Sequence, residues 1–163
     1  MTDRMLAWIR FAIGLEEKGL KFYKESLSST KHPRGMELFE FLIKVEKGHK
    51  KVLEELMDAV TKGDEAMMQK SVEDFMALNI KLPLFEERSL EKVTGDDTTL
   101  RDMFNTAAGF EKEGIEFYLR QAKDEGNPFV KKLLLKLAAD EKEHMGEIVS
   151  LGKFVFGMAI SID

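Results

Sequence analysis

Two short strings decide how this chain is expected to fold: EKGH at residues 46–49 and EKEH at residues 141–144. Each places a glutamate three residues before a histidine. On an α-helix, residues i and i+3 lie on one face, about one turn apart. A carboxylate and an imidazole with this spacing can reach the same point, so both strings predict metal-ligand pairs on helices.

A second string precedes each pair: LEEKGLKFY begins at residue 15 and FEKEGIEFY begins at residue 110. Both contain a glutamate, a glycine three residues later and a closing Phe-Tyr. The matched residues, each pair 95 positions apart, are Glu16 and Glu111, Gly19 and Gly114, Tyr23 and Tyr118, Glu46 and Glu141, and His49 and His144. A constant offset marks an internal repeat, so the chain is interpreted as a duplicated two-helix unit.

The repeat divides one expected domain, residues 1–163, into halves at about 3–61 and 98–156, joined by a connection at 62–97. Apolar residues at helical spacing predict two long helices in each half, and a short helix beginning near Asp64. The connection could extend for about 100 Å, whereas a 25-residue helix is only about 37 Å long. It is therefore long enough to bring the third long helix parallel to the second.

The inward stripes of these helices are apolar or aromatic, except for the repeated glutamates and histidines. An unpaired buried carboxylate is costly or takes up a proton. Two divalent cations would neutralise four carboxylates, so a two-metal site is the preferred interpretation, and a bundle that keeps these residues without metal is the alternative. The predicted ligands are Glu16, Glu46, His49, Glu111, Glu141 and His144. Their oxygen and imidazole atoms suit iron or manganese, and zinc could bind opportunistically.

One glutamate from each of two helices, with Glu-x-x-His from each of two others, resembles the ligand set of the ferritin-like di-iron carboxylate bundles. With its two E-x-x-G-x-x-F-Y strings, the chain resembles the rubrerythrin branch over most of its length. The resemblance implies an all-α, ferritin-like four-helix bundle made of two helical hairpins with one long crossover. It also implies two iron ions bridged by Glu46 and Glu141, with Glu16 and Glu111 as terminal ligands and one histidine on each iron.

Tyr23 and Tyr118 each lie two helical turns after a predicted ligand. They are interpreted either as core aromatics or as donors that orient a carboxylate or relay protons and electrons. Similar tyrosines flank the metals in rubrerythrins, which the chain resembles. One position departs from that family. Rubrerythrins carry a further glutamate three residues after the ligand of the third helix, where this chain has Gly114. The redox-linked ligand exchange attributed to that glutamate is therefore in question here.

The sequence contains no cysteine, which excludes disulfides, thiolate nucleophiles and iron–sulfur clusters within these residues. Classical rubrerythrins carry a cysteine-ligated rubredoxin domain, so here we expect electrons from an external donor, rubredoxin-like or other. The resemblance implies a di-iron oxidoreductase that reduces hydrogen peroxide or, more slowly, dioxygen. An iron-oxidising or iron-handling protein and a non-enzymatic, metal-stabilised interaction bundle are the alternatives.

The net charge of −5 and the lack of a Lys/Arg run give no reason to expect nucleic acid or an anionic membrane as a partner. No stretch reaches the roughly 18 to 20 apolar residues of a membrane span. Arg10 interrupts the apolar N-terminal run that resembles a signal sequence. A cytoplasmic protein is the expectation, and the apolar tail after Leu151 is expected to cap the bundle end or to form a homodimer contact.

Overall fold

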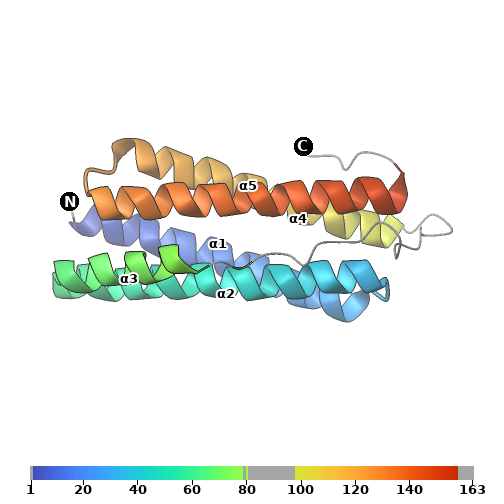
Figure 1. Ribbon diagram of the computed structural model, residues 1–163, viewed down its shortest axis with the longest axis horizontal. Coiled ribbons are helices and arrows are strands. Elements are labelled where there is room, and N and C mark those ends of the chain that lie inside the picture. The colour runs from blue at the N-terminus through green and yellow to red at the C-terminus, as the bar shows by residue number, and fades with distance from the viewer. Residues whose placement is uncertain (1, 79, 81–97, 158–163) are drawn as a thin grey trace.

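Five helices make up the part of the chain that this computed structural model describes, residues 2–78, 80 and 98–157 (Figure 1). The helices are α1 (Thr2–Ser29), α2 (Pro33–Lys62), α3 (Glu65–Ala77), α4 (Thr98–Asp124) and α5 (Pro128–Phe156). No strand occurs among the described residues, so the predicted all-α class is confirmed. None of these helices is both long enough and apolar enough to span a bilayer.

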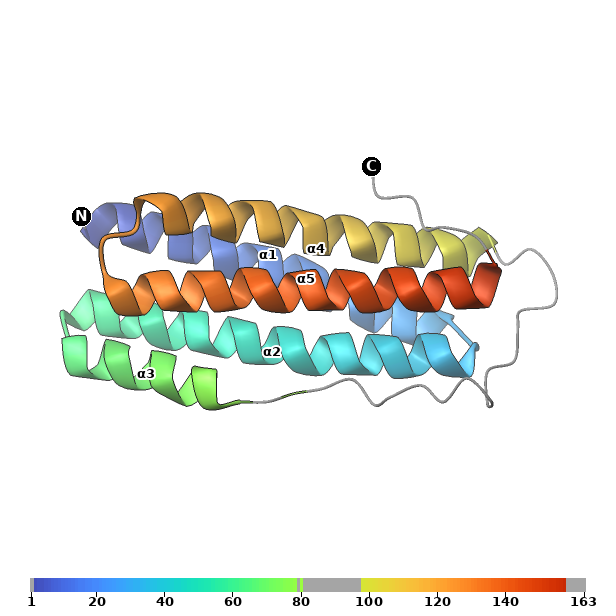
Figure 2. The same ribbon diagram turned by 45° about the horizontal axis from the view of Figure 1, so that its top comes forward.

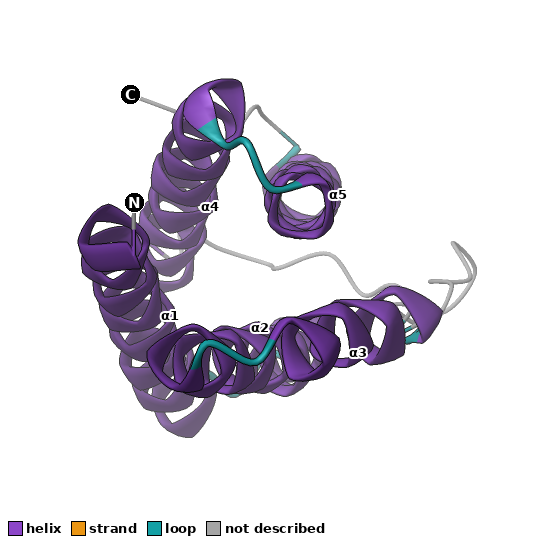
Figure 3. Ribbon diagram, turned by 90° about the vertical axis from the view of Figure 1, so that its left-hand side faces the viewer, coloured by secondary structure: helices purple, strands orange, loops and turns teal. Residues whose placement is uncertain are grey.

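The four long helices form two antiparallel hairpins, α1 with α2 and α4 with α5 (Figures 1 and 2). In Figure 1, α1 and α5 run from left to right, whereas α2 and α4 run from right to left. The third long helix is therefore parallel to the second, as the sequence predicted. The view along the bundle in Figure 3 shows α3 on the outside, where it packs against α2 and α5. The ferritin-like bundle is confirmed, and residues 79 and 81–97 of the predicted connection lie outside the described residues.

Matched caps begin the second helix of each hairpin. Oδ1 of Asn127 accepts hydrogen bonds from the backbone N–H groups of Phe129 and Val130 at 3.0 and 3.2 Å. Nδ1 of His32, 95 residues earlier, accepts one from the N–H of Gly35 at 3.4 Å. A proline follows each cap at the first helical position, where no N–H donor is needed. Asn127 and the half-buried His32 therefore begin their helices in the same way, as counterparts in the two repeats.

Helix α5 is longer than the sequence indicated. The tail was predicted to begin after Leu151, but the helix continues to Phe156 and ends at Gly157, whose φ of 66° is left-handed. Val155 is buried in the apolar cluster at that end of the bundle. Packing of an apolar face therefore extends the helix beyond the expected stop. Residues 158–163, the second half of the tail for which a homodimer contact was expected, lie outside the described residues.

Two apolar clusters fill the bundle, one toward each end. One contains Trp8 from α1, Leu56 from α2 and Leu134 from α5, and the other contains Phe39 from α2 and Phe104 from α4. In each long helix, the repeated glutamates and histidines fall between the segments that contribute to the two clusters. These polar residues therefore lie midway along the bundle, with close-packed apolar side chains on both sides.

Candidate metal centre

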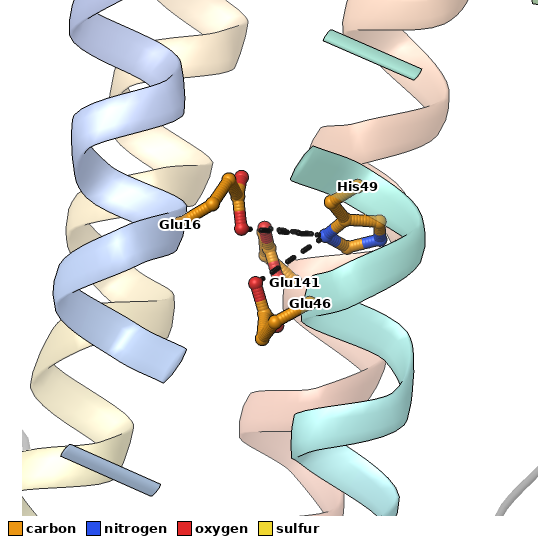
Figure 4. A group of neighbouring side chains, drawn as sticks. All are labelled: Glu16, Glu46, His49 and Glu141. Carbon is orange, nitrogen blue, oxygen red and sulfur yellow. Dashed lines mark ion pairs between the residues drawn. The ribbon is translucent and has the colours of Figure 1, made fainter. Parts of the chain in front are cut away.

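Six polar side chains meet in the middle of the bundle, and Figure 4 shows four of them. They are Glu16 from α1, Glu46 and His49 from α2, Glu111 from α4, and Glu141 and His144 from α5. Each is at most 4% exposed. The structure therefore brings together all six residues that the sequence named as candidate ligands.

The six residues form two overlapping groups, and within each group the candidate ligand atoms all lie within 4.8 Å of one another. The first group is Glu16, Glu46, His49 and Glu141, and the second is Glu46, Glu111, Glu141 and His144. Glu46 and Glu141 belong to both groups, and the other members are counterparts across the repeat. Two ion positions that share two carboxylates can be reached by this set of side chains.

His49 turns Nδ1 toward the carboxylates, as the dashed lines in Figure 4 indicate. This atom lies 3.2 Å from Oε1 of Glu141. It also lies 3.6 Å from Oε2 of Glu46 and 3.7 Å from Oε2 of Glu16. One ring nitrogen of His49 therefore faces three carboxylates from three different helices.

His144 repeats this arrangement in the second half. Its Nδ1 lies 3.1 Å from Oε2 of Glu141 and 3.5 Å from Oε2 of Glu111. Oε1 of Glu46 is 3.6 Å from the same atom. The rings of His144 and His49 are stacked, with centroids 5.6 Å apart and an interplanar angle of 22°. The two histidines therefore lie side by side and present the same ring nitrogen to the acidic cluster.

Burial and charge crowding shift the pKa values of this cluster. Burial, assisted by Glu141, raises the pKa of Glu111 to about 8 and raises the pKa of Glu46 well above its usual range. Burial opposes the charged form of His144, but hydrogen bonding and attraction to the surrounding carboxylates raise its pKa to about 9. Without metal, the cluster therefore holds protons at neutral pH that offset part of its negative charge, and bound cations would displace them.

Some polar atoms of the cluster lack a partner within the described protein. Oε1 of Glu46 and Nδ1 of His49 are buried and have no hydrogen bond to any described group. Buried polar atoms are normally hydrogen-bonded. A carboxylate oxygen and an imidazole nitrogen are also the atoms with which proteins bind iron, manganese or zinc. The residues present therefore fit a pair of metal ions.

A comparison with models of protein families matches residues 8–148 to Rubrerythrin. The matched segment covers most of the chain and includes all six candidate ligands. The chain belongs to the rubrerythrin family. This membership implies a two-metal site, and the buried Glu/His cluster provides a ligand set for one. Comparisons with curated proteins and with solved structures found no match.

Two buried tyrosines of this rubrerythrin-family chain link the two repeats. The hydroxyl of Tyr23 on α1 donates a hydrogen bond to Oε1 of Glu111 on α4. The hydroxyl of Tyr118 on α4 donates one to Oε1 of Glu16 on α1. Each tyrosine thus contacts the glutamate of the opposite repeat rather than the one on its own helix. Burial and the nearby carboxylates raise the pKa of both phenols well above the usual value, so both stay neutral donors.

Sequence reasoning missed a polar pair behind His49. Nε2 of His49 lies 3.5 Å from Oδ2 of Asp140, an ion-pair distance that is long for a hydrogen bond. Lys136 donates a hydrogen bond to Oδ1 of Asp140. Although burial acts against it, contact with His49 and Lys136 lowers the pKa of this carboxyl group. The signal in the sequence is an aspartate directly before Glu141. The first repeat has Val45 at the matching position, so Asp140 is not part of the repeated pattern.

Two small cavities border the cluster, one on the α2–α5 side and one on the α1–α4 side. The first, of about 30 Å³, is lined by both histidines and by residues that include Phe75, Asp140 and Glu143. The second, of about 20 Å³, is lined by residues that include all four glutamates, Tyr23 and Gly114. A cavity of this size holds about one water molecule. The described residues therefore leave room beside the cluster for a molecule about the size of water.

Gly19 and Gly114 are matched positions with different surroundings, and this difference predicts opposite effects of alanine. A β-carbon at Gly114 would lie 3.2 Å from Cγ of Glu141, whereas at Gly19 the nearest atom would be Cε2 of Tyr23 at 3.6 Å. Gly19→Ala is expected to stabilise its helix by up to about 1 kcal/mol. At Gly114, crowding in the packed interior costs about 1–3 kcal/mol. Gly114→Ala is therefore expected to leave the free energy of unfolding unchanged or to lower it.

Thermal unfolding of the two metal-free glycine variants measures this difference, with the unsubstituted chain as reference. The contact at Gly114 predicts a lower melting temperature for Gly114→Ala than for Gly19→Ala. Equal stabilisation by both substitutions would show that Glu141 moves aside without cost.

Proposed function

We propose that this chain is a di-iron oxidoreductase that reduces hydrogen peroxide, with dioxygen as a slower substrate and an external electron donor. The observation that carries the proposal is the pair of buried Glu/His groups that share Glu46 and Glu141. Four carboxylates balance the charge of two divalent ions, so the buried cluster becomes neutral when both are bound. Glu46 and Glu141 would bridge the ions, Glu16 and His49 would complete one position, and Glu111 and His144 would complete the other.

Two bound ferrous ions would supply the two electrons that, together with two protons, convert hydrogen peroxide into two molecules of water. The chain contributes orientation, because Tyr23 and Tyr118 hold the carboxylates of Glu111 and Glu16 through hydrogen bonds. Their raised pKa values keep each proton on the phenol oxygen beside the cluster. The apolar clusters on either side separate the site from bulk water along the bundle axis.

Iron oxidation or handling is the second candidate, and the surroundings of Gly114 favour it. The further glutamate of rubrerythrins would need space that Cγ of Glu141 borders, 3.2 Å from a β-carbon at this position. The described cluster thus has the six ligands common to ferritin-like di-iron bundles without that addition. Storage of an iron mineral would also require a closed cage, so a small oligomer in solution would argue against storage.

Stopped-flow spectroscopy of the anaerobically reduced, iron-loaded chain tests the proposal. We expect rapid oxidation that consumes about one peroxide per two irons and then stops, since each iron supplies one electron. These 163 residues contain no cysteine and hence no thiolate-ligated iron to re-reduce the site. Turnover should resume when a reduced rubredoxin-like donor is added.

The two oxidants separate the candidate functions. Oxidation by peroxide is expected to be faster than oxidation by an equal concentration of dioxygen. The reverse order would contradict the peroxidase proposal and support iron oxidation. An iron-loaded chain whose spectrum responds to neither oxidant would support the non-enzymatic interaction bundle.

A further inference from the structure

The two repeats match in every candidate ligand but differ behind their histidines. Nε2 of His49 is buried and has no hydrogen bond to any described group. The carboxylate of Asp140 faces this atom at 3.5 Å. Asp140 is held in turn by Lys136, one helical turn earlier on α5. The side of His49 that points away from the metal cluster therefore faces an acceptor whose position is fixed by a cation.

His144 has apolar side chains at the corresponding positions. The residues 95 positions before Asp140 and Lys136 are Val45 and Phe41, and both are buried. The ring of Phe41 meets His144 edge-on, with centroids 5.6 Å apart and an interplanar angle of 87°. Neither side chain offers a hydrogen-bond acceptor. The first repeat thus has Phe41 and Val45 where the second repeat has the Lys136–Asp140 ion pair.

This difference affects metal binding because a neutral imidazole has one N–H group and one lone pair. A histidine that binds metal through Nδ1 carries its proton on Nε2. A carboxylate that faces Nε2 favours this tautomer, fixes the orientation of the ring and raises the basicity of the ligand atom. Asp140 can do so for His49 after a small movement of its side chain. Val45 and Phe41 cannot do so for His144.

We propose that the two metal positions have unequal affinities, and that the position completed by Glu16 and His49 fills first because Asp140 and Lys136 position His49. The inference rests on the two-metal site of the proposed function and is independent of the peroxide reaction. Loss of a carboxylate that supports a metal-binding histidine typically weakens binding by about 10- to 100-fold. The difference between the two positions should therefore be about tenfold or more.

Calorimetric titration of the metal-free chain with Co²⁺, a probe that stays divalent under anaerobic conditions, tests this inequality. We expect two binding steps, the first about tenfold tighter or more. His49→Ala should remove the tight step, and His144→Ala should remove the weak one. Two ions bound with equal affinity would overturn the inference and leave the two-metal site intact. No binding at all would instead refute the site on which the proposed function depends.

Asp140→Val tests whether Asp140 causes the difference in affinity. The substitution introduces the residue that the first repeat has at the matching position, Val45. It should weaken the first step about 10- to 100-fold and leave the second nearly unchanged, so that the two steps merge. Glu143→Gln is the matched control. Glu143 is an exposed carboxylate on the same helix that lines the cavity beside both histidines, and no ion pair joins it to His49 in the described structure.

Glu143→Gln removes the same unit of charge and should change the first step by less than about twofold, because exposed charges interact weakly across solvent. An equal loss in both variants would assign the effect to general acidity and overturn the positioning role. Asp140→Asn keeps the shape of the side chain, so it replaces Asp140→Val in the titration if that variant does not fold. It should weaken the first step selectively, and an unchanged first step in a folded Asp140→Asn protein would also overturn the proposal.

Discussion

Replacing Glu141 with alanine is expected to abolish the loading of both metal ions, whereas replacing Glu16 with alanine should remove only one. Glu141 belongs to both candidate groups, and its two oxygens lie 3.2 Å from Nδ1 of His49 and 3.1 Å from Nδ1 of His144. Glu16 belongs to one group alone. Losing a shared carboxylate removes a ligand from both positions and leaves the remaining charges in the cluster unbalanced.

Elemental analysis after anaerobic loading with ferrous iron and removal of the excess measures this difference. Glu143→Ala is the control, because it removes an exposed carboxylate two residues away on the same helix, and it should retain two ions per chain. Far-UV circular dichroism of the metal-free proteins checks that each variant is helical. Two ions per chain in a helical Glu141→Ala protein would rule out the site as described.

Removing the metals is expected to lower the melting temperature by on the order of 10 °C. A ligand that binds only the folded state stabilises it by about 4 kcal/mol when its free concentration is about 1,000 times Kd. For a chain of this size, 1 kcal/mol corresponds to roughly 2–4 °C. The shift arises because the ions neutralise four glutamates that are each at most 4% exposed.

Differential scanning calorimetry with bound metal and after strong chelation measures the shift, and elemental analysis confirms that the metal was removed. The Glu141→Ala protein is the internal control, since a chain that loads no metal should melt at the same temperature with and without chelator. An unchanged melting temperature after complete removal from the natural chain would show that protons alone neutralise the cluster. The functional form of the cluster would then be metal-free, with the raised pKa values of Glu46 and Glu111 favouring their protonated carboxyl groups.

Much of this architecture could be predicted because its signals are local or periodic. Helix α2 begins at Pro33 and α5 at Pro128, where a cap followed by proline acts within one turn and can be recognised in the sequence. The end of α5 was predicted too early, because nothing near Leu151 reports the packing that buries Val155. A helix end without a strong local signal is decided by the surface it can bury.

The sequence by itself determined the helices and which residues of each face inward, and so named all six residues that meet in the cluster. Only the tertiary structure decided which inward residues touch. It paired Tyr23 with Glu111 across the repeat and placed Asp140 of α5 behind His49 of α2. The reason is physical: helical periodicity assigns a side chain to a face, whereas its partners depend on which other helices pack there and at what height along the bundle.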